Sequence, residues 1–248
     1  MISAGTHGSR GRWRDERCGP PSTGRPGRSG VGSAAGGCYV LRISSPASHT
    51  IFLLSPANLS GERAKLVLNP RAGFGLARAL HAGGAPLAEV FSFVSGLYFR
   101  GKAAYAQAFA RAPEEGDGAF VISAGEGLRP LHEAVTVPRL RAWADVEIDE
   151  DNDAFTSPLI RDAAALELAY GATTRFVLLG SVASDKYVGP LTQVFGDHLL
   201  FPTDFVGRGD MSRGALMLRA AREGTELAYE PVESAVRRGR RAPSIRKR

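Results

Sequence analysis

The stretch Ile51-Phe52-Leu53-Leu54-Ser55-Pro56 decides the fold class. Four consecutive large apolar residues closed by a Ser-Pro turn predict a strand that is buried on both faces. Similar short apolar runs recur along the chain, and the segments between them show the periodicity of amphipathic helices. Buried strands separated by helices predict an α/β fold, with a mixed, largely parallel sheet covered by helices in a single compact domain. The expected strands are 51–54, 120–122, 175–179, 199–201 and 226–231. A first helix is expected to begin after Ser60 and to end or bend at Pro70, and the further expected helices are 73–82, 86–94, 100–111, 158–170, 184–195 and 211–223.

Small and polar residues gather in the loops that follow three of these strands, at 55–61, 123–130 and 180–186. The carboxyl ends of neighbouring parallel strands meet at one edge of a sheet, and ligands bind at that edge. We therefore expect the three loops to surround one cleft. Its expected lining residues are Ser55, Asn58, Ser123, Glu126, Ser181 and Lys186.

The first two of these loops carry different expectations. Backbone amides near Ser55 and Asn58 suit an anion, although a capped strand-to-helix turn explains the same residues. Glycines in the second loop allow close approach of a ligand, so we take Ser123 and Glu126 as candidate catalytic residues, with Glu126 as an acid or base. The alternative for Glu126 is an ordinary solvated carboxylate.

Several other side chains are candidates for phosphate or nucleic-acid binding. Residues 95–102 form a glycine-punctuated turn in which Tyr98 suits stacking on a base while Arg100 and Lys102 suit phosphate. Further along, Asp210 or Ser212 is expected to cap a helix and to leave the neighbouring arginines facing an anion, although a solvated surface explains them almost as well. The remaining candidates of this kind are Arg129, Ser184, Lys186, Arg208 and Arg213.

Charge is concentrated at the two ends of the chain. Residues 1–38 hold six Arg against two acidic residues, a net charge of +4, and residues 232–248 hold seven Lys or Arg against Glu233, a net of +6. Because the whole chain carries +6, the body at 39–231 is net negative, which excludes a basic coat protein. We expect a disordered Gly/Arg-rich leader at 1–38, an α/β domain at 39–231 and a flexible basic tail at 232–248.

Other classes of protein are disfavoured by what the sequence lacks. No apolar run approaches the roughly 20 residues of a membrane span, and the leader has no apolar segment of a secretory signal. Cys18 and Cys38 suit neither a disulfide framework nor a metal site. Walker, GxSxG and HExxH motifs are absent. We expect a cytoplasmic protein with no metal, no cofactor and no membrane partner.

Four segments, taken in order, resemble the YaaA family of peroxide-stress proteins. Leu53–Asn58 is similar to that family's opening strand and Ser-Pro-Ala-Lys turn, with Asn58 in place of the lysine. Ser123–Leu131 is similar to its Ser-Gly-Leu-Tyr-Gly-x-Leu-Arg-Pro-Leu loop, one residue shorter. Val182–Tyr187 resembles its Leu-Ala-Ser-x-x-Tyr segment, and Arg208–Arg213 its Arg-Gly-x-Met-x-Arg stretch. The family's Tyr-Arg-Leu-Glu-Met block is replaced here by Val-Pro-Arg-Leu-Arg at 137–141.

The resemblance implies an α/β body with a groove that binds nucleic acid, and a role in limiting oxidative damage to DNA. The expected partner is DNA, double-stranded, or a nucleotide-like ligand, and the basic tail supplies affinity for phosphates. No catalytic mechanism comes with the family. The alternative function is an enzyme that acts on a nucleobase or nucleoside, by N-glycosidic or base-modification chemistry, through Ser123, Glu126 and the turn at 55–58.

Overall fold

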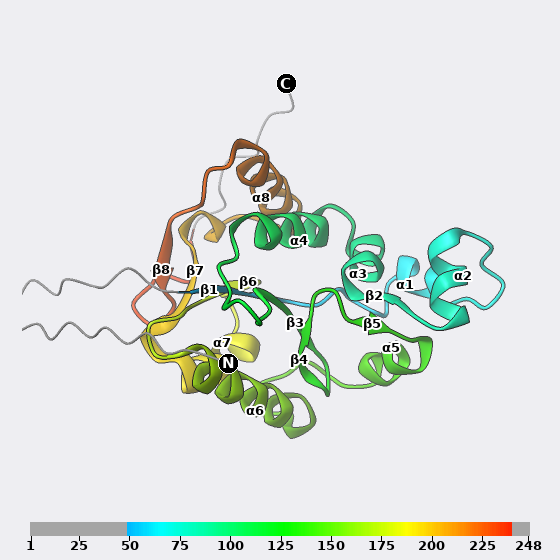
Figure 1. Cartoon of the computed structure of the whole chain (residues 1–248), viewed down its shortest axis with the longest axis horizontal. Coiled ribbons are helices and arrows are strands. Elements are labelled where there is room, and N and C mark those ends of the chain that lie inside the picture. Colours follow the sequence, from blue (N-terminus) through cyan, green and yellow to red (C-terminus); the bar gives the residue numbers. More distant parts are fainter. Residues whose placement is uncertain (1–48, 240–248) are drawn as a thin grey trace, which may run out of the picture. The chain divides into compact units, whose positions relative to one another are not determined.

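A six-stranded sheet crosses the centre of the computed structural model, which describes residues 49–239 (Figure 1). Its strand order is β4-β3-β1-β6-β7-β8. The four central strands run parallel to one another and are β3 (Ala119–Ser123), β1 (Thr50–Leu54), β6 (Arg175–Leu179) and β7 (Leu199–Pro202). The two edge strands are antiparallel to their neighbours and are β4 (Gly127–Pro130) and β8 (Tyr229–Pro231). The prediction of a largely parallel α/β sheet in a single compact domain is confirmed.

The apolar run at 51–54 forms the middle of this sheet, and every residue of β1 is buried. Leu54 lies opposite Val121 on one side and Leu179 on the other, so the three predicted strands are direct neighbours. A strand with buried residues on both faces requires helices on both sides of the sheet. The predicted leader at 1–38 lies outside the described residues, as do residues 240–248 of the predicted tail.

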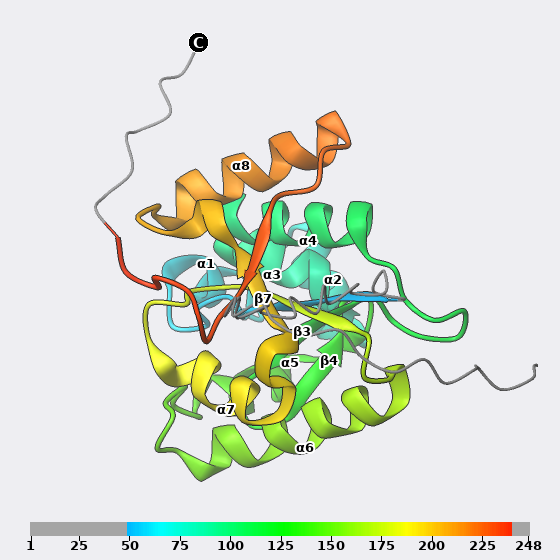
Figure 2. The same cartoon turned by 90° about the vertical axis from the view of Figure 1, so that its left-hand side faces the viewer.

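Helices cover both faces of the sheet. On one face lie α4 (Leu97–Phe109) and α8 (Asp210–Glu223), and on the other lie α6 (Asp153–Tyr170) and α7 (Asp185–Phe195) (Figures 1 and 2). The short elements of the domain gather beside α3 in Figure 1. These elements are α1 (Glu62–Val67), α2 (Gly75–Ala82), β2 (Ala85–Pro86), α3 (Leu87–Ser95), β5 (Ala134–Val135) and α5 (Val137–Ala144).

Helices α4 and α8 cross with their backbones in contact. A Cβ atom on Gly214 would lie 2.7 Å from the carbonyl oxygen of Leu97, and one on Gly101 would lie 2.6 Å from the carbonyl oxygen of Gly214. No real Cβ atom makes contacts this short with backbone atoms, so both positions require glycine. The close crossing brings the charged residues at the start of α8 against the buried face of α4.

The structure corrects two sequence expectations near the cleft. Residues 97–102 are the first turns of α4 rather than part of a glycine-punctuated turn, so Tyr98 and Lys102 lie four residues apart on one helical face. The predicted loop at 123–130 is a tight hairpin, in which Gly127 has a φ of +79° and begins strand β4. Helix α5 and the two-stranded sheet of β2 and β5 were not predicted.

The packed body continues into the predicted tail. Val232 is buried, and its backbone amide donates a hydrogen bond to Leu199. Further on, Arg237 forms a 2.5 Å ion pair with Asp185, and the guanidinium of Arg238 donates to the carbonyl oxygen of Ala183. Over residues 49–239, no helix has the combined length and apolar character that a bilayer crossing needs.

Candidate functional site

A cleft of about 440 Å³ opens at the carboxyl ends of the parallel strands. All three predicted loops border it: Ser55 and Asn58 come from the loop after β1, Ala124 from the hairpin after β3, and Ser181 and Lys186 from the segment after β6. Its volume falls in the range of small-molecule sites. The expectation that the three loops meet at one edge of the sheet therefore holds in the structure.

Ser123 does not line this cleft, contrary to expectation. Its side chain is fully buried, and its hydroxyl donates a 2.9 Å hydrogen bond to the carbonyl oxygen of Gly127. This bond closes the hairpin between β3 and β4. A nucleophile must be accessible to its substrate, so the buried Ser123 hydroxyl has a structural role instead.

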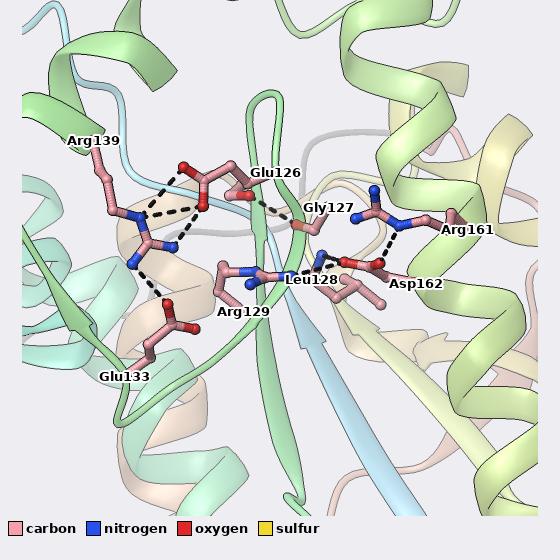
Figure 3. Close-up of polar contacts among 9 residues, drawn as sticks. Glu126, Gly127, Leu128, Arg129, Glu133, Arg139, Arg161 and Asp162 are labelled. Carbon is pink, nitrogen blue, oxygen red and sulfur yellow. Dashed lines mark hydrogen bonds and ion pairs between the residues drawn. The ribbon is translucent and has the colours of Figure 1, made fainter.

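Glu126 also lies outside the lining of the cleft, in an ion-pair cluster (Figure 3). Arg139 of α5 donates to Glu126 at 2.5 Å and to Glu133 at 2.7 Å. The hydrogen bond from Arg139 is the largest influence on the Glu126 carboxyl and holds its pKa below the ordinary value. A general acid at neutral pH needs the opposite shift. The cluster instead ties the hairpin to α5, which forms one wall of the cleft.

Arg129 is engaged in a second cluster on the other side of the same hairpin (Figure 3). Asp162 of α6 accepts hydrogen bonds from the Arg129 guanidinium at 3.1 Å, from the backbone amide of Leu128 at 3.0 Å and from Arg161 at 2.8 Å. Burial raises the pKa of Asp162, but these three donors outweigh it, and the pKa is lowered. Arg129 therefore anchors edge strand β4 to α6 and does not face the cleft.

A buried lysine–serine pair joins α4 to the end of β1, and its serine lines the cleft. The Lys102 ammonium nitrogen lies 2.5 Å from the backbone oxygen of Ser55 and 3.0 Å from its hydroxyl oxygen Oγ. Lys102 is fully buried, and its nitrogen lies 4.4 Å from the centre of the Tyr98 ring and 4.9 Å from that of Phe99. Ser55 is 6 % exposed and lines the cleft.

The surroundings of Lys102 disfavour its charged form. Burial lowers the pKa of Lys102 to about 7; Asp210 opposes this shift and Arg213 adds to it. A buried amine with a pKa near neutrality carries a free lone pair in a large fraction of molecules at pH 7. Lys102 therefore has the chemistry of a base rather than of the phosphate-binding cation that the sequence predicted.

Tyr98 contributes a polar group that no described residue satisfies. The residue lines the cleft, and its hydroxyl is buried and makes no hydrogen bond of good geometry among residues 49–239, although the Arg213 and Ser55 side chains lie close to it. Burial raises the pKa of this hydroxyl, with Arg213 opposing the shift, so the phenol keeps its proton at neutral pH. A buried hydroxyl without a partner costs free energy, and a ligand oxygen or nitrogen at the cleft floor would remove that cost.

Four aromatic side chains line the cleft, among small, aliphatic and polar residues. Besides Tyr98 they are Phe91 of α3 and Trp143 of α5, which meet edge to face with ring centres 6.4 Å apart, and Tyr187 of α7. Asn58 also lines the cleft, although its side chain accepts hydrogen bonds from both the amide and the hydroxyl of Ser60. The capped-turn interpretation of the first loop thus holds for Asn58.

The predicted cations differ in availability. Lys186 lines the cleft and has no acidic partner within the described part of the chain, and Arg100 is exposed on α4. Arg208 lies 3.8 Å from Asp204 in an ion pair. Lys186 and Arg100 are therefore the predicted body cations that can meet an anion at the surface.

The expectations for the start of α8 were wrong. Arg213 is buried rather than facing an anion, and its guanidinium donates two hydrogen bonds to the carbonyl oxygen of Phe205. Asp210 does not cap the helix but lies 3.8 Å from Arg213 and lines the cleft. Ser184, a predicted phosphate-binding residue, directly precedes α7, and its side chain makes no capping hydrogen bond.

Sequence reasoning missed the aromatic walls and the acidic group of the cleft. Trp143 carried a usable signal, because it is the only tryptophan between residues 14 and 248. Lys102 carried another, since it interrupts a run of apolar residues on α4 whose members are buried. Nothing local pointed to its pairing with Ser55, which is 47 residues away in the sequence.

No group of three or more His, Cys, Asp and Glu side chains within residues 49–239 has a metal-binding arrangement. Comparisons with protein-family models, curated proteins and solved structures found no match to this chain.

Proposed function

We propose that the protein is an enzyme that acts on a nucleobase or nucleoside bound in the cleft. The size of the cleft suits such a molecule, and its aromatic walls suit a planar heterocycle, whose faces stack on aromatic rings. Polar groups at the floor and rim, among them Tyr98, Lys186 and Asp210, suit the donors and acceptors at the edge of a base. This is the alternative that the sequence left open, with Ser55 rather than Ser123 at its centre.

One observation carries the proposal: the protonated Tyr98 hydroxyl, which is buried at the cleft and makes no hydrogen bond of good geometry within residues 49–239. A ligand that accepts a hydrogen bond from it gains more than it would from an exposed tyrosine, because a buried donor is shielded from bulk water. Removing the hydroxyl from the complex should cost about 1 to 1.5 kcal/mol, or roughly five- to tenfold in affinity.

The test is a titration with nucleobases, nucleosides and nucleotides followed by tryptophan emission. A Trp13→Phe background leaves Trp143 as the sole emitter, because the chain has two tryptophans. We expect quenching by at least one compound and a roughly five- to tenfold weaker Kd in Tyr98→Phe. Tyr170→Phe is the matched control, since it removes a hydroxyl bonded to Asp117 outside the cleft. Absence of binding across the panel would refute the proposal.

A second candidate function, the binding of DNA, is favoured by the path of the C-terminal segment. Arg237 and Arg238 hold this segment against Asp185 and Ala183, at the start of the helix that supplies Lys186 to the cleft. Five further Lys or Arg residues follow at 240–248. If these cations bind the phosphates of a DNA strand, the bases of that strand lie near the cleft. A role in limiting oxidative damage to DNA stays a prediction from the YaaA resemblance.

Affinity for a DNA duplex, measured against salt concentration, tests this second candidate. Each neutralised phosphate contributes about −0.9 to the slope of log affinity against log salt, so deleting residues 240–248 should flatten the slope by about 4. Arg100→Gln with Lys186→Gln measures the contribution of the body, because both cations lack acidic partners within residues 49–239. A slope unchanged by the deletion would show that the tail is not the electrostatic arm.

A further inference from the structure

We propose that Ser55 is the nucleophile of an acyl-transfer reaction and that Lys102 is its general base. The inference rests on the proposed function for its substrate class, which is an ester or amide carbonyl carried by a nucleoside-like molecule. Its chemistry rests on the geometry of the two side chains.

Ser55 has the position that a nucleophile needs. It directly follows β1 at the carboxyl edge of the sheet and lines the cleft. Its backbone is held on both sides, because its amide donates to Leu179 at 3.2 Å and its carbonyl oxygen accepts from Lys102 at 2.5 Å. A fixed backbone restricts where the hydroxyl can lie, which is the preorganisation that a reacting group requires.

Lys102 has the distance and the protonation state of a base. Its nitrogen is 3.0 Å from Ser55 Oγ, within the range for direct proton transfer. In the structure the Ser55 hydroxyl donates to the carbonyl oxygen of Leu179 at 3.4 Å and accepts from Lys102. Rotation of this hydroxyl turns its proton to the lone pair of the neutral amine, which keeps its own hydrogen bond to the Ser55 carbonyl oxygen. Serine–lysine pairs of this kind occur as variants of the serine–histidine arrangement.

The groups that face Lys102 come from two helices. On α4, Tyr98 and Phe99 place their rings against the amine, and on α8, Asp210 and Arg213 place opposite charges near it. Burial favours the neutral amine before reaction, and Asp210 stabilises the ammonium that forms during reaction. Because Asp210 also lines the cleft, it disfavours a substrate that enters as an anion and favours one with a neutral carbonyl.

The reaction balances with water as its only co-reactant. Ser55 Oγ forms a bond to the carbonyl carbon while its proton passes to Lys102, and the carbonyl π electrons move to oxygen, where the Tyr98 hydroxyl can donate a hydrogen bond. Collapse of this intermediate breaks the bond to the leaving group, which takes the proton from Lys102. Water then attacks the Ser55 ester, gives its proton through Lys102 to the serine oxygen, and releases the carboxylic acid.

A short-chain alkyl fluorophosphonate tests the pair without knowledge of the substrate. Ser55 Oγ would attack phosphorus, the P–F bond would break with loss of fluoride, and the proton would pass to Lys102. Intact mass and peptide mapping should show one adduct, on Ser55, and none in Ser55→Ala. The labelling rate should rise through about pH 7, where Lys102 loses its proton, and then level off.

Lys102→Met should reduce the labelling rate at pH 8 by about 100-fold or more, the usual contribution of a general base. Lys65→Met is the matched control and should label at the wild-type rate, because Lys65 is an exposed residue of α1 paired with Glu62. If Lys102→Met fails to fold, the pH profile of the wild-type protein still tests the base.

Three results would overturn the proposal: no adduct on the folded protein, an adduct on another residue, or a rate independent of both pH and Lys102. The test also separates the two proposals. Labelling of Ser55 without protection by any nucleobase or nucleoside would retain the nucleophile and refute the ligand class. Nucleoside binding without labelling would retain the ligand class and refute Ser55 as the nucleophile.

Discussion

Replacing Lys102 by methionine should stabilise the protein, and the gain should depend on pH. Methionine fills a similar volume without charge. The unfolded chain protonates this lysine near its ordinary pKa of 10.5, but the folded protein does so only below about 7. At pH 7 the difference costs the folded protein about 4 kcal/mol. The substitution also removes the hydrogen-bond donor of two Ser55 oxygens. This loss destabilises the variant by about 2 kcal/mol and offsets part of the gain. We therefore expect Lys102→Met to be about 2 kcal/mol more stable at pH 7.

The sign of the pH dependence follows from the direction of the pKa shift. Between pH 7 and 10.5 the unfolded state binds more protons than the folded state, so the stability of the wild-type protein rises with pH. Methionine has no such dependence. The advantage of the variant should therefore shrink by about 2 kcal/mol between pH 7 and pH 9, by the same linkage.

Urea unfolding at pH 7, 8 and 9 measures this change directly. Lys65→Met is again the control, because its lysine is exposed and should give a difference from wild type that does not vary with pH. A constant difference between Lys102→Met and wild type over this range would refute the argument, since it would mean that the buried lysine keeps its proton in the folded protein.

Two further predictions concern the supports of the site. Gly214→Ala should destabilise the protein by about 3 kcal/mol or more in urea unfolding, because its Cβ meets the backbone of α4, whereas Gly189→Ala, at an uncrowded position in α7, should be neutral or slightly stabilising. Glu126→Gln should lower stability by less than about 1 kcal/mol, since both side chains of the Arg139 pair are partly exposed to solvent. The loss of stability should be present above pH 4.5, the ordinary pKa of a glutamate, and disappear at lower pH. The reason is that the pKa of Glu126 is lowered in the folded protein, so its stabilising charge is lost only on acidification. Nucleoside affinity should not change in this variant.

The central sheet was predictable because apolar runs of four or five residues have few alternatives to a buried strand. The loops at its carboxyl edge followed from the geometry of parallel strands. The error at 95–102 has a physical cause, since two glycines were taken as turn markers. Gly96, with a φ of +62°, does separate α3 from α4, but Gly101 lies within α4 because α8 crosses there. Glycine thus separates two helices at one position and permits a close helix crossing at the other, and the local sequence does not distinguish these two roles.

The chemistry of the site was less predictable than its location. Lys102 was expected to bind phosphate on the basis of its charge, yet its pKa is set first by burial and then by Asp210 and Arg213 of α8, which reach it only through tertiary packing. Likewise Ser123 and Ser55 both lie at the ends of apolar strand segments, and each hydroxyl donates to a backbone carbonyl. What distinguishes Ser55 is its place in the cleft lining and its hydrogen bond from Lys102, and both depend on tertiary packing.

The described chain begins at the amino end of β1 and finishes beside the cleft at the carboxyl ends of the parallel strands. This difference decides where a tag should be attached. His49 precedes β1 at its amino end, and a five-residue strand spans about 16 Å before the cleft begins. Arg237 and Arg238, by contrast, rest on residues beside the cleft. An affinity tag or fluorophore fused after residue 239 would start near the cleft entrance and compete with ligands for it. Immobilisation through the amino-terminal side keeps that entrance clear for ligand screens.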